Sequence, residues 1–438
     1  MKTSWRDILY SMGNISSNLA GQAVGTFAIF YYSDVLRTPV EWISLAMVLY
    51  GIWNAINDPL FGQISDRTRT RWGRRIPYVR FLSVPLAIAF ALLWMPPFKA
   101  GSGMPLFWYY LGIMFLFDGL FTVVILNWTA LFPEMYASLE DRTRVSAWRQ
   151  VLGIIGLILG VAIPPLIYGS LGWPAMGAIF AVIIALCLLL TLAGSRENPA
   201  FAEEPSLPLG QALKATFANR SFLTYVLASL MIQFTFTMLT ATLPFYVKYV
   251  LHGAEAQTSM LLGAIFAVAL PMIYIWSRLT ARYGARRTLM LSVAVYGLFL
   301  TPLLFVNTVW QGVATTALVG GGIAGILLLL DVLIADVIDE DELKTGLRRE
   351  GMYFGVNGFM IRLGISLQAV LMGVVLKQTH YDPALAVQPA TAVFGLRVLV
   401  AVIPLVGLVL ALLLLRVYPL DGRRLAEVRE ALRVRRAA

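Results

Sequence analysis

The chain contains twelve long apolar stretches, and this repetition constrains the fold more than any other feature of the sequence. Each stretch is about 20 residues long or longer, which is the length that an α-helix needs to cross the hydrocarbon core of a bilayer. They span residues 8–33, 42–64, 78–96, 105–132, 147–170, 174–194, 221–249, 257–277, 287–306, 310–335, 352–377 and 391–417. Backbone polar groups find no water inside a bilayer, so we expect helices rather than open sheets. The sequence therefore predicts an all-α membrane protein with twelve transmembrane helices.

The composition agrees with an integral membrane protein and excludes several other classes. Hydrophobic residues make up 59% of the 438 residues and charged residues only 13%, whereas a soluble domain carries about 25% charged residues. Cys187 is the single cysteine, so the chain can form neither an internal disulfide nor a cysteine metal cluster. The sequence has only two histidines and no recognisable catalytic group. We therefore expect a protein that is not an enzyme and that needs no cofactor.

The distribution of the 34 Lys and Arg residues predicts the orientation of the chain. One side carries nearly all of them, at Lys2, Arg6, 67–80, 142–149, the 195–220 segment, 278–287, 344–349 and the tail. The other side carries only Arg37, Lys99, Lys248 and Lys377. By the positive-inside rule, we expect a multi-pass protein of the cell inner (plasma) membrane with both termini in the cytoplasm. The net charge of +10 follows from this topology, so we expect contact with the lipid bilayer and no nucleic-acid partner.

The sequence divides into two halves joined by a polar segment. Residues 195–220 are interrupted by prolines and acidic residues and separate the sixth stretch from the seventh. The prediction is an N-terminal six-helix half over 1–194, a cytoplasmic linker over 195–220, a C-terminal half over 221–417 and a cytoplasmic tail over 418–438. Within the tail, Leu425, Val428 and Leu432 recur at helical spacing, which predicts a short amphipathic helix at the membrane surface.

Two features indicate that the halves are related. Residues 71–75 read Arg-Trp-Gly-Arg-Arg, and residues 282–287 read Arg-Tyr-Gly-Ala-Arg-Arg in the corresponding loop of the second half. Arg149 and Arg362 also occupy corresponding positions. Short basic loops can converge by chance, because such motifs are weakly specific. Two related halves of six helices, with the substrate site between them at the midplane, are the organisation of major-facilitator transporters.

A motif in the second stretch resembles a known family. Residues 53–59 read Trp-Asn-Ala-Ile-Asn-Asp-Pro, and Arg-Trp-Gly follows at 71–73. This resembles the glycoside–pentoside–hexuronide:cation symporter family, the melibiose-permease-like branch of the major facilitators, whose pattern is Trp-Asp-Ala-Ile-Asn-Asp-Pro and then Arg-x-Trp-Gly. The resemblance covers the whole chain, including Tyr-Tyr-Ser-Asp at 31–34 and Ala335-Asp336. It implies a symporter of a small sugar or glycoside, neutral or anionic, with a cation.

The resemblance implies a coupling-cation site, for Na⁺ or H⁺, at Asn54, Asn57, Asp58 and Thr122. The chain departs from the family pattern at Asn54, where the family has an acid. Asp118 lies four residues before Thr122 and shares its helix face; an acid at this position is similar to the lysophospholipid-symporter branch. A carboxylate inside a bilayer is costly and functional by default. We expect Asp58 to be the essential carboxylate and the sodium ligand if sodium is used, with Asp118 as a second acid or as a structural carboxylate.

The resemblance also implies a substrate site. The family acids of this site are replaced by Asn18 and Ile125, whereas Arg149 and Arg362 keep the family's basic character. The forked donors of an arginine can bind an anionic or polyhydroxyl substrate. These arginines could equally neutralise buried acids, and Arg149 could extend to the membrane interface. Trp128 is a candidate for stacking on a sugar ring, although most membrane aromatics pack in the core or at the interface.

Charged residues near the cytoplasmic loops predict a gate. Asp66 lies beside the basic residues of 67–75, which include Arg71 and Arg74, and the acidic residues of 336–342, which begin with Asp336, lie near the basic residues of 344–349. Single surface pairs contribute little to stability, but a network that forms in only one access state could bias the transport cycle. Asp331, in the tenth stretch, is expected to be buried and has no assigned role.

The sequence as a whole predicts a monomeric secondary active transporter that works by alternating access. The expected cargo is a glycoside, pentoside or hexuronide. A lysophospholipid or another amphiphile is the alternative cargo in the same fold, and it would require a hydrophobic cleft open to the bilayer. A channel or receptor is the alternative of another class, and the two related halves with charged residues near the midplane argue against it.

Overall fold

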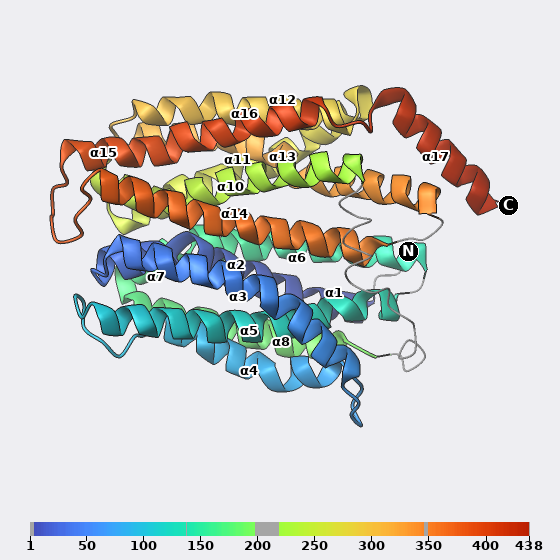
Figure 1. Cartoon of the computed structure of the whole chain (residues 1–438), viewed down its shortest axis with the longest axis horizontal. Helices are drawn as coiled ribbons and strands as arrows, with labels where there is room; N and C mark the ends of the chain where they lie inside the picture. The colour runs from blue at the N-terminus through green and yellow to red at the C-terminus, as the bar shows by residue number, and fades with distance from the viewer. Residues whose placement is uncertain (1–3, 137, 198–218, 346–348, 438) are drawn as a thin grey trace. The chain divides into compact units, whose positions relative to one another are not determined.

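The structure is a computed structural model built from helices (Figure 1). It describes residues 4–136, 138–197, 219–345 and 349–437. The elements are α1 (Trp5–Ser11), α2 (Gly13–Phe30), the π-helical turn η1 (Tyr31–Val35), α3 (Val40–Arg67), α4 (Ile76–Leu93), α5 (Met104–Met135), α6 (Leu139–Ala162), α7 (Pro164–Leu171), α8 (Trp173–Gly194), α10 (Arg220–Tyr249), α11 (Glu255–Tyr283), α12 (Ala285–Leu300), the 3-10 turn η3 (Thr301–Leu304), α13 (Val309–Thr345), α14 (Glu350–Gln378), α15 (Ala390–Arg397), the π-helical turn η4 (Val398–Val402), α16 (Ile403–Arg416) and α17 (Gly422–Ala437). No β-strand occurs within these described ranges.

Ten helical segments of the described residues are long and apolar enough to cross a membrane. The prediction of an all-α membrane protein is confirmed, but the count of twelve transmembrane helices is not. The first two predicted spans correspond to α1–η1 and to α3, which are absent from the ten. Both segments contain asparagines, such as Asn14 and Asn18 in α2 and Asn54 and Asn57 in α3. These polar side chains lower the mean hydropathy of the two segments.

The chain forms two compact units, which are described separately. Unit 1 comprises Met1–Pro205, Ala254–Ser259 and Asp382–Ala386; unit 2 comprises Ser206–Gly253, Met260–Tyr381 and Val387–Ala438. In unit 1, α2 packs against α6 and α8, and α5 packs against α3 and α4. In unit 2, α12 packs against α13, and α10 packs against α14 and α16.

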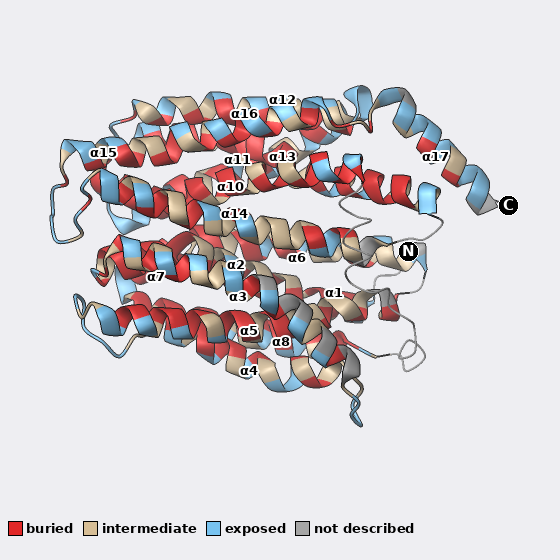
Figure 2. Ribbon diagram, viewed as in Figure 1, coloured by how far each residue is buried: buried red, intermediate tan, exposed pale blue. Residues whose placement is uncertain are grey.

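The helices bury one part of their surface and expose another (Figure 2). Many of the exposed side chains are large and apolar, including Ile88, Val182, Leu298 and Leu413. Exposed apolar surface on this scale is rare in soluble monomers and marks a surface that contacts a partner or a membrane. On these transmembrane-length helices, it suits contact with lipid.

Glycines allow the helices of unit 2 to approach closely. A Cβ atom at Gly320 of α13 would overlap the carbonyl oxygen of Ile265 in α11. A Cβ atom at Gly322 would lie 2.5 Å from the backbone nitrogen of Tyr296 in α12. Small residues at such positions let helix backbones pack directly against one another inside a membrane. The glycine run of α13 is therefore a packing surface for two neighbouring helices.

We expect Gly320→Ala to destabilise the protein, because its new methyl group would meet a backbone atom that cannot rotate away. Overpacking of this kind costs about 1–3 kcal/mol. Gly321→Ala is the matched control, since the nearest atom to its Cβ would be the flexible Met272 Cε at 4.0 Å. Thermal unfolding of both variants in detergent should show a lower Tm for Gly320→Ala only. Equal melting temperatures would contradict this packing.

The amphipathic helix predicted in the tail is present as α17. Val428 and Leu432 are buried. Two arginines join α17 to α13: Arg429 lies 2.8 Å from Asp336, and Arg424 lies 2.5 Å from Glu340. Helix α17 is therefore docked on the end of α13 by apolar contacts and ion pairs.

Candidate functional site

A polar cluster lies near the middle of two neighbouring helices of unit 1, α3 and α5. Asp118 of α5 is 3% exposed. Its carboxylate accepts three hydrogen bonds from α3, from the Tyr50 hydroxyl at 3.1 Å, the Asn54 amide at 2.9 Å and the Asn57 amide at 2.5 Å. An ionised carboxylate is acceptor-only, and hydrogen bonds to it are stronger than neutral ones. This arrangement of donors therefore suits a charged Asp118.

Helical periodicity explains why these residues meet. Tyr50, Asn54 and Asn57 are spaced by four and three residues, so they lie on one face of α3. Asp118 and Thr122 are spaced by four residues on α5, and this places them on one face as well. The sequence prediction that Asn54, Asn57, Asp118 and Thr122 lie together is consistent with this geometry. Tyr50 was missed, although its spacing of four residues from Asn54 could have identified it.

The amide group of Asn57 connects the Asp118 carboxylate to Thr122. Its amide nitrogen lies 3.3 Å from Thr122 Oγ1 as well as close to Asp118. Its amide oxygen is buried and accepts no hydrogen bond among the described residues. An unsatisfied buried acceptor is costly and is commonly explained by a water or an ion. Carboxylate, amide and hydroxyl oxygens are the ligands that hard cations prefer, so this cluster fits Na⁺.

The cluster differs from a transition-metal centre. No group of three or more His, Cys, Asp or Glu residues that could hold a metal ion occurs in the part of the chain that the structure describes. The side chain of Asp58, which the sequence predicts to be the essential carboxylate, lies outside the described residues. Its role stays a prediction, and among described side chains Asp118 is the acid at the centre of the cluster.

A second polar region of unit 1 surrounds Arg149 on α6. Its guanidinium carbon lies 4.9 Å from the ring centre of Trp128 and 4.8 Å from that of Phe132, both on α5. A guanidinium stacks favourably on aromatic faces in this way. The Nε of Arg149 is buried and has no hydrogen-bond partner among the described residues. The stacked side chain therefore keeps a buried donor that no described acceptor uses.

Trp128 supports Arg149 and is itself enclosed. It is 1% exposed, and its indole N–H donates to the carbonyl oxygen of Tyr10 at 3.1 Å. The Tyr10 hydroxyl donates in return to the carbonyl oxygen of Trp128 at 3.0 Å, and the two rings lie 5.5 Å apart. In this structure, the ring is therefore part of the packing that positions Arg149, and it offers no open face for a sugar.

Two asparagines of α2 lie against the same region. The Asn14 amide donates to the carbonyl oxygen of Arg149 at 2.5 Å, and the Asn18 amide donates to the carbonyl oxygen of Asn14 at 3.0 Å. Unit 1 therefore places Asn18 and Arg149 in one region between α2 and α6, and their role as a substrate site stays a prediction. Arg362 lies on α14 of unit 2, and its convergence with Arg149 stays a prediction.

Arg74, which was predicted to belong to a gate, lies in a charged network at the start of α4. Glu134 lies 2.7 Å from Arg74 and 3.0 Å from Arg75. The Glu197 carboxylate accepts hydrogen bonds from the backbone N–H groups of Arg74, Arg75 and Ile76 at 2.7, 3.0 and 3.3 Å. A carboxylate at this position also interacts favourably with the helix dipole. Glu134 and Glu197 were not identified from the sequence.

Gly73 makes room for this network, and Arg71 lies beside it. The φ of Gly73 is +102°, a left-handed conformation that favours glycine, and a Cβ atom there would overlap the Glu197 carboxylate. The guanidinium carbon of Arg71 lies 4.1 Å from the ring centre of Trp72. Arg71 was predicted to pair in the gate; its described contact is this ring, and the pairing stays a prediction. The side chain of Asp66 lies outside the described residues.

A second group of charges lies at the end of α13 in unit 2. Acids of 336–342 were expected to pair with basic residues of 344–349, and two such pairs are present: Lys344 lies 2.9 Å from Glu340, and Arg349 lies 2.5 Å from Asp341. The hydrogen bond from Arg349 to the Asp341 carboxylate raises the pKa of the Arg349 guanidinium above its ordinary value. Asp336 itself lies 2.8 Å from Arg429 of α17, a partner that sequence proximity alone does not indicate.

Asp331 was expected to be buried in the tenth span. Its side chain in α13 keeps accessible surface, although the surrounding protein removes much of its contact with solvent. The neighbouring Leu330 and Leu333 are buried, so the helix turns its apolar face toward the unit and leaves Asp331 on the other face.

Comparison with known proteins adds independent information. The MFS/sugar transport protein family model matches residues 9–422. The chain is 26% identical to the isoprimeverose transporter of Lactiplantibacillus pentosus, over 94% of this chain and 88% of that protein. It is 26% identical to the glucuronide carrier protein homolog of Escherichia coli (strain K12), over 97% and 94%. It is also 26% identical to sodium-dependent lysophosphatidylcholine symporter 1 of Mus musculus, over 98% and 88%.

Solved structures agree on the fold. The crystal structure of the nucleoside transporter NupG matches this chain with a TM-score of 0.63, over 95% of this chain and 100% of that one. The sequences are only 13% identical, so this similarity concerns the fold alone.

Proposed function

Because the chain belongs to the MFS/sugar transport protein family, we propose that it is a symporter that couples a glycoside, pentoside or hexuronide to Na⁺ by alternating access. The observation that carries the sodium coupling is the Asp118 cluster with the buried, unsatisfied amide oxygen of Asn57. A proton requires only a carboxylate, whereas Na⁺ also uses neutral oxygen ligands. The cluster therefore favours Na⁺ over H⁺, which is the alternative coupling ion.

Cation binding at this cluster supplies a physical basis for coupling. The carboxylate of Asp118 is a buried negative charge, and a charge inside a bilayer is costly. A cation bound by Asp118, Asn57 and Thr122 would lower this cost and join α3 to α5. A ligand shifts a conformational equilibrium only by its differential affinity for the two states. We infer that Na⁺ binds more strongly in the state that also binds the substrate.

Arg149 is the proposed substrate contact in unit 1. Its stacking on Trp128 and Phe132 restricts the orientation of the guanidinium, which reduces the entropy lost when a ligand binds. Forked donors bind carboxylates in a bidentate manner, so a hexuronide or another acidic glycoside fits this position. Asn18, which replaces a family acid, adds no negative charge that would repel such a substrate. Arg362 is the proposed contact from unit 2.

A lysophospholipid is the alternative cargo. The similarity to the sodium-dependent lysophosphatidylcholine symporter over 98% of the chain favours it, and a lysophospholipid phosphate would also suit the donors of Arg149. The two candidate cargoes share the proposed sodium site, so their difference lies in the substrate only.

A thermal-shift screen of the purified protein tests both parts of the proposal. Sugars, uronates and lysophospholipids are added with NaCl or with choline chloride. A ligand at about 100 times its Kd stabilises the folded state by about 2.7 kcal/mol, so the cargo should raise the Tm, and more so with Na⁺. A response to lysophospholipid alone would support the alternative cargo. Equal shifts in NaCl and choline chloride would contradict sodium coupling.

We propose a monomeric protein of the cell inner membrane with both termini in the cytoplasm. In a Cys187→Ser background, Lys99→Cys should react with an impermeant maleimide added outside intact cells, and Arg69→Cys should not. Both positions are exposed, whereas Cys187 is buried, so side-chain burial does not determine the outcome. Arg69→Cys should react after the membrane is permeabilised. Labelling in the reverse pattern would overturn the orientation.

A further inference from the structure

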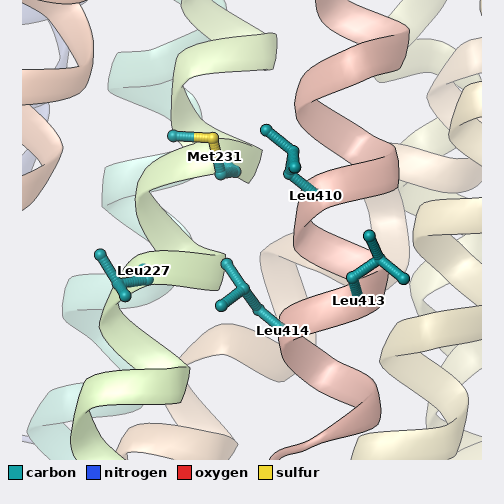
Figure 3. Close-up of a pocket in the computed structure, with 5 residues that line it drawn as sticks. All are labelled: Leu227, Met231, Leu410, Leu413 and Leu414. Atoms are coloured by element: carbon teal, nitrogen blue, oxygen red, sulfur yellow. The ribbon is translucent and has the colours of Figure 1, made fainter.

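An apolar groove lies between α10 and α16 of unit 2. It has a volume of about 320 Å³ and is lined by Leu227, Met231, Leu410, Leu413 and Leu414. Figure 3 shows Leu227 and Met231 of α10 beside the three leucines of α16. These side chains offer no strong hydrogen-bond donor or acceptor. The groove therefore suits a hydrocarbon chain and not a sugar.

The groove begins next to a point where α10 and α16 are in close contact. The Thr235 hydroxyl of α10 donates to the carbonyl oxygen of Pro404 in α16 at 3.1 Å. A Cβ atom at Gly407 would lie 2.8 Å from Thr235 Oγ1, so the helices touch there through small residues. Larger side chains follow on both helices, at Met231 and Leu410, and the groove begins at this level (Figure 3).

The groove is open to the exterior of the unit. Leu410 and Leu413 are 45% and 55% exposed. Both α10 and the segment that contains α16 are long and apolar enough to cross a membrane. The medium around such helices is lipid, and an open apolar groove on them is filled by acyl chains at no desolvation cost.

Two arginines lie near one end of the groove. The hydrogen bond from Thr235 to Pro404 and the position of Leu227 beside Leu414 in Figure 3 show that α10 and α16 run antiparallel. The first residue of α10, Arg220, and the last residue of α16, Arg416, therefore lie on the same side. At 1.5 Å per residue, they lie about 10 Å beyond Leu227 and about 3 Å beyond Leu414 along the helices. An extended arginine on each helix can thus reach a phosphate at the end of an acyl chain.

Both arginines are available for such a contact. Arg220 and Arg416 are exposed, and neither forms an ion pair with a described residue. The acid nearest to Arg416 in the sequence, Asp421, lies 3.1 Å from Arg286 instead. Because Asp421 pairs with Arg286, it does not neutralise Arg416, and the end of the groove carries positive charge.

We propose that this groove binds an anionic phospholipid of the surrounding bilayer. One acyl chain lies along the five apolar side chains, and the headgroup phosphate lies between Arg220 and Arg416. This site is separate from the cation and substrate residues, which lie on other helices, and it does not depend on the proposed transport function.

Photo-crosslinking in nanodiscs tests the site directly. The full-length protein is reconstituted with a small fraction of phosphatidylglycerol that carries a diazirine in its acyl chain, and adducts are mapped by peptide mass spectrometry. Adducts should concentrate on α10 and α16 at the five lining positions. A basic residue near an anionic lipid surface contributes enough to change binding about fivefold. Arg220→Gln and Arg416→Gln should each lower the adduct yield by about this factor, and unlabelled phosphatidylglycerol should compete better than phosphatidylcholine.

Arg282→Gln is the matched control, because Arg282 is also exposed and lies at the end of α11, outside the groove. It should leave the adduct yield unchanged. Equal labelling of the exposed Val182 on α8, which does not line the groove, would mean that the groove holds only bulk lipid and would overturn the proposal. Unchanged yields in both groove variants would do the same. Displacement by lysophosphatidylcholine but not by phosphatidylglycerol would also overturn it and would assign the groove to the cargo.

Discussion

Replacing Asp118 with asparagine is expected to abolish concentrative uptake in proteoliposomes while leaving the protein folded. The carboxylate accepts hydrogen bonds from Tyr50, Asn54 and Asn57, and asparagine has nearly the same shape without the charge. An interaction with a charged group is worth about 1.5–3 kcal/mol, which corresponds to roughly 10- to 100-fold in sodium affinity. Uptake driven by an imposed sodium gradient should fall to the level of exchange without accumulation.

A double variant separates the charge from its position. In the structure, the Asn54 amide lies 2.9 Å from the Asp118 carboxylate. Asn54→Asp combined with Asp118→Asn should therefore move the acid from α5 to α3 within the same cluster and recover part of the sodium-driven uptake. Thr122→Val should cause a smaller loss, because it removes one neutral oxygen. If Asp118→Asn accumulates substrate like the wild type while Asp58→Asn does not, the coupling carboxylate is Asp58 alone.

Replacing Arg149 with alanine is expected to weaken substrate binding while leaving sodium binding intact. The guanidinium is stacked on Trp128 and Phe132 and keeps a buried, unused Nε donor, so its loss removes charge-assisted hydrogen bonds of about 1.5–3 kcal/mol. Titration calorimetry at saturating NaCl should show roughly 10- to 100-fold weaker binding of the substrate found by thermal shift.

Two further variants distinguish the roles of Arg149. Arg149→Lys keeps the positive charge but loses the forked geometry, so an anionic substrate should bind with intermediate affinity. Lys99→Gln removes an exposed basic side chain outside the proposed site and should bind substrate like the wild type. Unchanged affinity in Arg149→Ala would remove Arg149 from the substrate site.

The parts of the fold that depend on local patterns could be predicted from the sequence. The apolar stretches predicted helices, and Val428 and Leu432 predicted the apolar face of the tail helix, because hydropathy and helical periodicity are properties of neighbouring residues. The same periodicity explains why Asn54 and Asn57 share a face of α3 and can meet Asp118. The count of transmembrane helices does not follow from apolar length alone, since amide side chains lower the mean hydropathy of α2 and α3.

Several contacts between distant segments could not be predicted. Glu197 caps the start of α4 from beyond the end of α8, and no local pattern indicates that a residue so far along the chain closes this helix. Asp336 pairs with Arg429 because α17 folds back onto α13, whereas sequence proximity favoured other partners. Tyr10 encloses Trp128 because the first helix packs against α5. The positions of aromatic residues in the sequence do not indicate this packing.

Equilibrium binding of radioactive sodium to the purified protein tests the central claim most directly, because it needs neither the substrate nor transport. The measurement compares the wild type, Asp118→Asn and the double variant Asn54→Asp with Asp118→Asn at one pH. We predict saturable sodium binding to the wild type, loss of this binding in Asp118→Asn, and partial recovery in the double variant. Sodium binding that is unchanged in Asp118→Asn, or absent from the wild type, would contradict the assignment of this cluster as the coupling-cation site.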